Sequence, residues 1–244
     1  MTATRKAAGG RDRVRLLALA LATLAASAAA AAALPAQGAT TNAKVLGETK
    51  HTPPPACPKD CKGVGSLTGF QIRADGVRKP FLARENGRIV AWSVNLSKPS
   101  KDQRQFFGNL WKTDRYGTDP TARLAVIRHV RGKRYKLLRQ SPVVNLSHAY
   151  GERLYITLDH PLRLRTGQIV AVTLPTWAPL FAVNIPRSEN LWRASQSPKR
   201  CITSTSPLSY ARNSRPHQKV GSARTYGCVY HAARLEYWAY YVPK

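Results

Sequence analysis

The chain has 244 residues, of which 39 are Lys or Arg and only 12 are Asp or Glu, giving a formal charge of +27. This charge favours anionic partners such as envelope polyphosphate, acidic polysaccharide, anionic lipid or nucleic acid, and it does not distinguish among them. The alternative is that the excess of positive charge has no function and reflects a coding bias toward Arg and Ala. No linker-like stretch follows Gly65, which excludes a multidomain arrangement of the rest of the chain.

The first 39 residues are predicted to be a cleaved secretion signal. A basic leader is followed by a small and apolar run from Leu16 to Leu34 and then by Pro-Ala-Gln-Gly-Ala, which is the three-part layout of a signal peptide. Cleavage is expected after Gly38 or Ala39, with an earlier cut after Ala33 as the alternative. No Cys follows the apolar run and no Arg-Arg pair precedes it, so ordinary secretory export is expected. The competing interpretation is a retained membrane anchor formed by residues 16–34.

Residues 40–63 contain three consecutive prolines and few large apolar side chains, which predicts an extended tether. The folded domain is expected over 64–244, where short β-type runs alternate with turn signals. These runs are 67–72, 88–94, 123–130, 135–138, 154–158, 168–174, 181–184 and 235–242.

Two tight turns are predicted, one at Asn86-Gly87 and one around Gly132, since both sequences tolerate a positive φ. Between them, 88–94 has apolar residues on both faces of a strand, with Ile89 on one face and Trp92 on the other. Helical spacing occurs only over 102–111. The sequence therefore predicts an all-β fold, a single antiparallel β-sandwich of jelly-roll type with one short helix.

All four cysteines lie in the part expected to be exported, where an even number normally forms disulfides. The expected pairs are Cys57 with Cys61, in a short Pro-containing loop, and Cys201 with Cys228; cross-pairing is the alternative. Cys201 and Cys228 lack the close spacing of zinc ligands, so no metal site and no cofactor is expected.

Three stretches resemble secreted bacterial β-sandwich proteins with a lectin-like jelly-roll layout. They are Asn86-Gly87-Arg88-Ile89-Val90-Ala91-Trp92-Ser93-Val94, the strand from Arg123 to Arg128, and Leu174-Pro175-Thr176-Trp177-Ala178-Pro179. The similarity spans residues 65–185. It implies a fold and an extracellular location, and it names no activity and no site residue.

No catalytic residue is predicted. The chain has no Gly-x-Ser-x-Gly, His-Glu-x-x-His or Gly-x-x-x-x-Gly-Lys sequence, which disfavours the enzyme classes built on them. Cys228 and His231 are three apart, which places them on opposite faces of a strand. The acidic residues are scattered, and Asp159-His160 and Ser147-His148 lie near turns without an indicated third partner. An extracellular hydrolase using carboxylates or a Ser/His pair is retained as an alternative function.

Binding features are more prominent. The stretch from Asn190 to Leu235 contains no acidic residue and eight Lys or Arg residues, Arg200 among them. Its Ser, Pro and Asn content from Ser195 to Ser222 predicts a long loop there. Tyrosines interleave with its charges and offer stacking surfaces beside them. The candidate ligand-binding residues of this stretch are Tyr210, Arg212, Arg215, Lys219 and Arg224; Tyr226 is a further stacking candidate.

Two further candidates lie outside that stretch. A second basic cluster is expected at a hairpin tip and comprises Arg128, Arg131, Lys133, Arg134, Lys136 and Arg139. Trp177 lies between two prolines where a loop is expected, so its indole is a candidate platform for a sugar ring; the alternative is that it caps the core.

The sequence thus favours a secreted or envelope-associated, non-catalytic binding module for an anionic or glycan polymer, with nucleic acid a possible but unspecific partner and no small-molecule cofactor. A structural interaction protein with incidental charge is the third hypothesis. A steep loss of binding with salt separates the first hypothesis from the third, because polyanion binding releases counterions.

Overall fold

The computed structural model describes residues 43–111, 116–201 and 218–244, all of which belong to one compact unit over 40–244. The predicted signal peptide, its cleavage site and the alternative anchor lie outside these described residues. Within them, no helix has both the length and the apolar character needed to cross a membrane.

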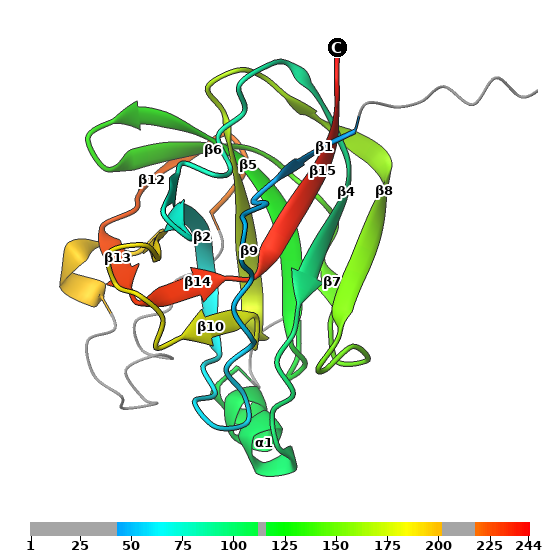
Figure 1. Cartoon of the computed structure of the whole chain (residues 1–244), viewed down its shortest axis with the longest axis vertical. Helices are drawn as coiled ribbons and strands as arrows, with labels where there is room; N and C mark the ends of the chain where they lie inside the picture. The colour runs from blue at the N-terminus through cyan, green and yellow to red at the C-terminus, as the bar shows by residue number, and fades with distance from the viewer. Residues whose placement is uncertain (1–42, 112–115, 202–217) are drawn as a thin grey trace, which may run out of the picture. The chain divides into compact units, whose positions relative to one another are not determined.

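Antiparallel sheets make up most of this unit (Figure 1). The first sheet has the strand order β1 (Lys44–Leu46), β15 (Tyr237–Pro243), β4 (Gly87–Asn95) and β8 (Arg153–Leu164). The second has the order β12 (Ala223–Thr225), β6 (Arg134–Gln140), β5 (Thr121–Arg131), β9 (Ile169–Ala178), β2 (Val64–Ala74), β11 (Leu191–Ala194) and β13 (Cys228–His231).

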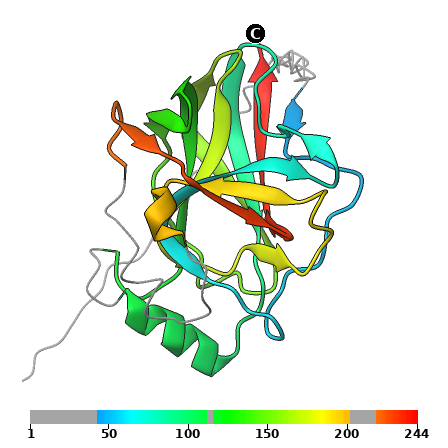
Figure 2. The same ribbon diagram turned by 90° about the vertical axis from the view of Figure 1, so that its left-hand side faces the viewer.

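Short elements complete the unit. β3 (Val77–Arg78) pairs with β2, β7 (Val144–Asn145) pairs with β5, and β10 (Phe181–Val183) pairs with β14 (Ala233–Leu235). The α-helix α1 (Lys101–Leu110) lies at the end of the sandwich away from the C-terminus (Figures 1 and 2), and η1 (Pro198–Arg200) is a 3-10 turn.

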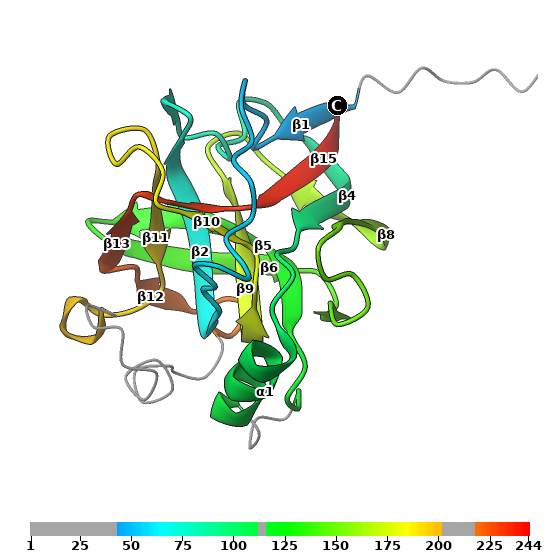
Figure 3. The same cartoon turned by 60° about the horizontal axis from the view of Figure 1, so that its bottom comes forward.

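The predicted all-β antiparallel sandwich with one short α-helix in the described part is confirmed. Figure 3 shows β1, β15, β4 and β8 on one side and β2, β11 and β13 on the other. The chain changes sheet between β4 and β5, between β6 and β8, and again between β8 and β9, so partners in a sheet are often distant in sequence.

The second sheet is buried on both faces, as β5 shows. Leu124 and Val126 belong to the main core between the sheets, whereas Ala125 and Ile127 belong to a second apolar cluster. Side chains that alternate along one strand point to opposite faces, so the second cluster lies on the other side of the same sheet. Its fully buried centre is Tyr226.

A β-bulge changes the predicted facing of β4. The ladders with β15 and β8 both shift between Ile89 and Ala91. An extra residue in a strand reverses the alternation beyond it, and as a result Ile89 and Trp92 are both fully buried in the main core. The prediction that they face opposite ways was therefore wrong.

The turn at Gly132 is confirmed, because Gly132 has φ 52° and Arg131 pairs with Arg134. Gly87 has another role from the one predicted. It begins β4, and a Cβ atom there would lie 2.5 Å from the Val242 carbonyl oxygen, so the residue allows a close approach of strands.

Residues 43–63 differ from the predicted tether, since they are packed on the sandwich. β1 pairs with β15, and the amide of Ala56 donates to the carbonyl of Phe181 at 2.9 Å. Arg234 holds the intervening segment: its Nη1 donates to Thr49 Oγ1 at 2.8 Å and to the His51 carbonyl at 2.9 Å. Sequence composition alone did not reveal this buried arginine as the anchor.

Both predicted disulfides, Cys57–Cys61 and Cys201–Cys228, are present. The helix prediction is also confirmed, with α1 beginning one residue earlier than expected. A capping box explains this start, because Ser100 accepts from the Gln103 amide and the Gln103 side chain accepts from the Ser100 amide.

Candidate functional site

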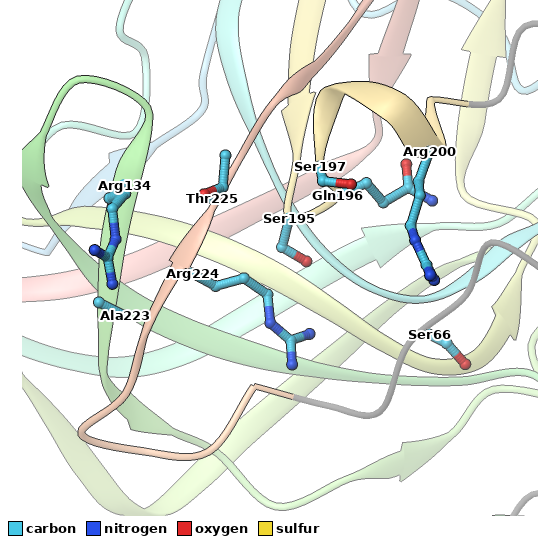
Figure 4. A pocket seen from close by; sticks show the side chains of 9 residues that line it. All are labelled: Ser66, Arg134, Ser195, Gln196, Ser197, Arg200, Ala223, Arg224 and Thr225. Carbon is cyan, nitrogen blue, oxygen red and sulfur yellow. The ribbon is translucent and has the colours of Figure 1, made fainter.

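A basic pocket of about 350 Å³ opens beside β12 and η1 (Figure 4). Below it is called the arginine pocket. Its lining comes from the start of β2, the start of β6, the whole of β12, the segment that joins β11 to η1, and the end of η1 itself. The lining residues are Ser66, Arg134, Ser195, Gln196, Ser197, Arg200, Ala223, Arg224 and Thr225.

Strand pairing brings two basic regions of the sequence together here. β12 pairs with β6, with Arg224 opposite Tyr135 and Thr225 opposite Arg134. The tip of the β5–β6 hairpin thus lies beside the strand that carries Arg224. In Figure 4 the side chain of Arg200 extends from η1 toward Ser66, and that of Arg224 extends from β12 into the space between β12 and Ser66.

Close packing fixes the position of Arg200. The disulfide from Cys201 to Cys228 joins the residue after η1 to the start of β13. The amide of Gly227 donates to the Gln196 carbonyl at 2.6 Å, and a Cβ atom on Gly227 would lie 2.4 Å from Pro198 Cδ. Only glycine fits this contact without a shift of η1.

Hydrogen bonds also hold the segment that leads into η1. Ser195 Oγ accepts from the Thr68 amide at 2.8 Å, and Tyr230 Oη donates to Gln196 Oε1 at 2.8 Å. Because a hydroxyl is both a donor and an acceptor, Ser195 keeps its own O–H for a ligand. Ser66 Oγ is committed within the fold, donating to the Pro175 carbonyl and accepting from Trp111 Nε1.

The pocket presents guanidinium groups without carboxylates. Its nine lining residues include three arginines and no Asp or Glu. Within the described residues, neither Arg134 nor Arg200 takes part in an ion pair. A guanidinium group offers a planar fork of N–H donors that matches carboxylate and phosphate oxygens, so the arrangement suits an anionic group.

The structure places only some of the predicted ligand-binding residues at the arginine pocket. Arg224 lines the arginine pocket, whereas Lys219 is exposed on the preceding turn and does not line it. Tyr210, Arg212 and Arg215 lie outside the described residues.

Trp177 is 1% exposed and lies in β9, where the sequence predicted a loop. Its ring stacks on Phe107 with centroids 5.1 Å apart, and its Nε1 donates to the Thr118 carbonyl. This geometry matches the alternative in which Trp177 is a core residue. β9 accommodates Pro175 because the strand bulges there: residues 175–176 lie opposite the single residue Ser66 of β2, which interrupts the ladder.

Tyr226 is also not the stacking surface that the sequence suggested. It is fully buried, and its hydroxyl donates to Gln218 Oε1 at 3.0 Å. Burial raises the pKa of this hydroxyl, so the group stays neutral and belongs to the second apolar cluster.

In the sequence, Arg134 belongs to the hairpin-tip cluster and Arg200 to the basic stretch 190–235, and no local pattern connects the two. Ser195 was also not predicted. The basic stretch 190–235 contains β11, β12, β13 and β14, which lie outside the loop predicted over 195–222, and these strands make the connection; within the described part of that loop only η1 is regular. The expected bridge from Cys201 to Cys228 was the one signal in the sequence that placed Arg200 close to β13.

The pairs considered for catalysis lie in the described part, and none of them lies in the arginine pocket. Cys228 is disulfide-bonded, so no thiol is present beside His231. Asp159 and His160 are exposed in β8 and do not line the arginine pocket. No group of three or more His, Cys, Asp or Glu side chains there is placed to hold a metal ion.

Comparison of the chain with protein-family models, curated proteins and solved structures gives no match.

Proposed function

We propose that this protein is an exported, non-catalytic binding module whose arginine pocket holds an anionic group of an envelope polymer or glycan. The observation that carries the proposal is the gathering of Arg134, Arg200 and Arg224 around one pocket whose lining has no carboxylate. The formal charge of +27 draws polyanions to the surface, and the pocket provides a place for one anionic group to be held.

Export is the second part of the proposal. It is supported by the signal-like sequence of residues 1–39 and by two disulfides, which are typical of proteins in oxidising compartments. Expression in a secreting bacterial host should give a protein in the medium that begins at Ala39 or Thr40, as measured by mass spectrometry. A cell-bound chain that retains residues 16–34 would support the membrane-anchor alternative.

The binding proposal is tested by retention of the purified protein on immobilised polyphosphate, polygalacturonate, duplex DNA and neutral dextran, at low and high salt. The test variant is Arg200→Gln/Arg224→Gln. Its matched control is Arg84→Gln/Arg187→Gln, which removes the same charge at exposed positions outside the pocket.

Salt-sensitive retention on an anionic polymer, lost in the test variant and kept in the control, is the expected result. Equal retention of both variants on every polyanion would mean that the charge acts without a defined site. That outcome would favour the structural interaction protein with incidental charge.

A further inference from the structure

A second hollow, of about 420 Å³, lies where the second apolar cluster meets solvent. Its apolar lining includes Phe70 and Ile72 of β2, Tyr135 of β6 and Ile169 of β9. Phe70 is buried within the cluster, and the other three are partly buried against it. Volumes of roughly 300–1,000 Å³ with mainly apolar walls are typical of small-ligand sites.

Aromatic contacts make this wall rigid. Phe70 and Tyr135 have ring centroids 5.1 Å apart, and both rings contact Tyr226, at 5.9 Å and 5.0 Å. His129 packs edge-on against Tyr135 at 5.2 Å, while its Nε2 contacts the Gly132 carbonyl at 2.8 Å. The hollow therefore has a preformed floor.

A guanidinium group lies beside this apolar wall. Arg193 of β11 is the direct cross-strand partner of Phe70, so both side chains are on one face of the sheet. Nη1 of Arg193 donates to the Tyr226 carbonyl at 2.9 Å, which orients the guanidinium group. A guanidinium has five N–H donors, so most of them remain for a ligand.

Lys79 provides the second charge at the rim. Its backbone is fixed on both sides, because its amide donates to the Ile72 carbonyl at 2.8 Å and its carbonyl accepts from the Leu82 amide at 3.1 Å. Its side chain is exposed, and the residues that line the hollow include no Asp or Glu.

We propose that this hollow binds a small amphipathic anion, namely a monocarboxylate with an apolar body. The body packs on Phe70, Ile72 and Ile169, and the carboxylate pairs with Arg193 and Lys79. The site is separate from the arginine pocket, with which it shares no lining residue. It therefore does not rest on the proposed function.

The test is calorimetric titration of the purified protein with hexanoate, octanoate and decanoate, and with decanol as the uncharged counterpart. Affinity should rise up to about fourfold for each added methylene, because the wall covers apolar surface. Decanol should bind at least about tenfold more weakly than decanoate, since it has no charge to pair with Arg193.

Variants locate the site. Arg193→Gln and Lys79→Gln should each weaken decanoate binding, with Arg193→Gln causing a loss of about tenfold or more, and Arg193→Lys should restore part of it. Arg187→Gln removes one exposed charge elsewhere and should have no effect. Circular dichroism and thermal unfolding verify that each variant is folded.

The variant Arg200→Gln/Arg224→Gln separates this proposal from the previous one, because it should bind decanoate normally even if polymer binding is lost. Absence of saturable binding would overturn the inference. Equal affinity for decanoate and decanol, or a loss of decanoate binding only in Arg200→Gln/Arg224→Gln, would also overturn it.

Discussion

At the residue scale, the buried pair of Arg234 and Glu236 joins the N-terminal segment to the sandwich. The two side chains are 2% and 0% exposed, and Arg234 Nε lies 3.3 Å from Glu236 Oε1. Burial raises the pKa of Glu236 to about 7, even though the nearby positive charges of Arg234 and Arg153 act in the opposite direction. The free energy of unfolding should therefore depend on pH through this carboxyl group.

The sign of this dependence follows from proton binding. An unfolded Glu has a pKa of roughly 4.3, so between about pH 4.3 and 7 the folded state binds more protons and stability falls as the pH rises. Glu236→Gln removes this contribution. In urea unfolding, the difference in free energy of unfolding between the variant and the wild type should shift in favour of the variant by roughly 3 kcal/mol from pH 5 to pH 8. Parallel pH profiles would contradict the raised pKa.

Gly227 gives a second prediction at this scale. In Gly227→Ala the new methyl group meets Pro198, which should displace η1 and cost about 1–3 kcal/mol of stability. Binding to the arginine pocket should weaken as well, because η1 carries Arg200. Val220→Ala, at a 57% exposed position, is the control. A variant with wild-type thermal stability would show that the contact is less tight than it appears in the structure.

At the scale of elements, the two disulfides should contribute unequally. Cys57–Cys61 closes a separation of 4 residues and Cys201–Cys228 one of 27. From loop-closure entropy, removal of the longer bridge should cost about 3.5 kcal/mol and removal of the shorter one about 2 kcal/mol. The comparison is urea unfolding of Cys201→Ala/Cys228→Ala and Cys57→Ala/Cys61→Ala.

Binding distinguishes the bridges further. The Cys201–Cys228 variant should also lose affinity for polyanions, because Arg200 is adjacent to the bridge, whereas the Cys57–Cys61 variant should keep it. An equal effect of both variants on polyanion binding would argue against the role assigned to η1 in shaping the pocket.

Elements with a local signal were predictable from the sequence, and those defined by distant partners were not. The helix and the hairpin at Gly132 depend on spacing and turn chemistry that the sequence shows directly. β11 and β13 have only four residues each, too few for a clear alternation, and they become strands because they pair with each other and, for β11, with β2. The bulges at Val90 of β4 and at Pro175 of β9 depend on neighbouring strands, so local alternation could not reveal them.

In the arginine pocket, too, only the residue with a local signal was predictable from the sequence. Arg224 was identified from a local excess of positive charge. Its neighbours Arg134 and Arg200 enter the pocket through the β12–β6 pairing and the Cys201–Cys228 bridge. The register of the β12–β6 pair is a long-range property that charge patterning does not contain.

At the scale of the whole molecule, the charge of +27 gives every polyanion a general attraction to the surface. The arginine pocket is proposed to provide a defined part of that attraction. If attraction is general, removing any two exposed arginines should change the salt dependence of polymer affinity equally. If one site binds the polymer, only removal of arginines in that site should change it.

The most direct test is the slope of log affinity against log salt concentration for an anionic polymer, measured for the wild type and for Arg200→Gln/Arg224→Gln. Each arginine that neutralises polymer charge contributes roughly one unit, so the slope should fall by about two. The control Arg84→Gln/Arg187→Gln should keep both the slope and the affinity of the wild type. If both pairs lower the slope and the affinity alike, the arginine pocket is not the binding site.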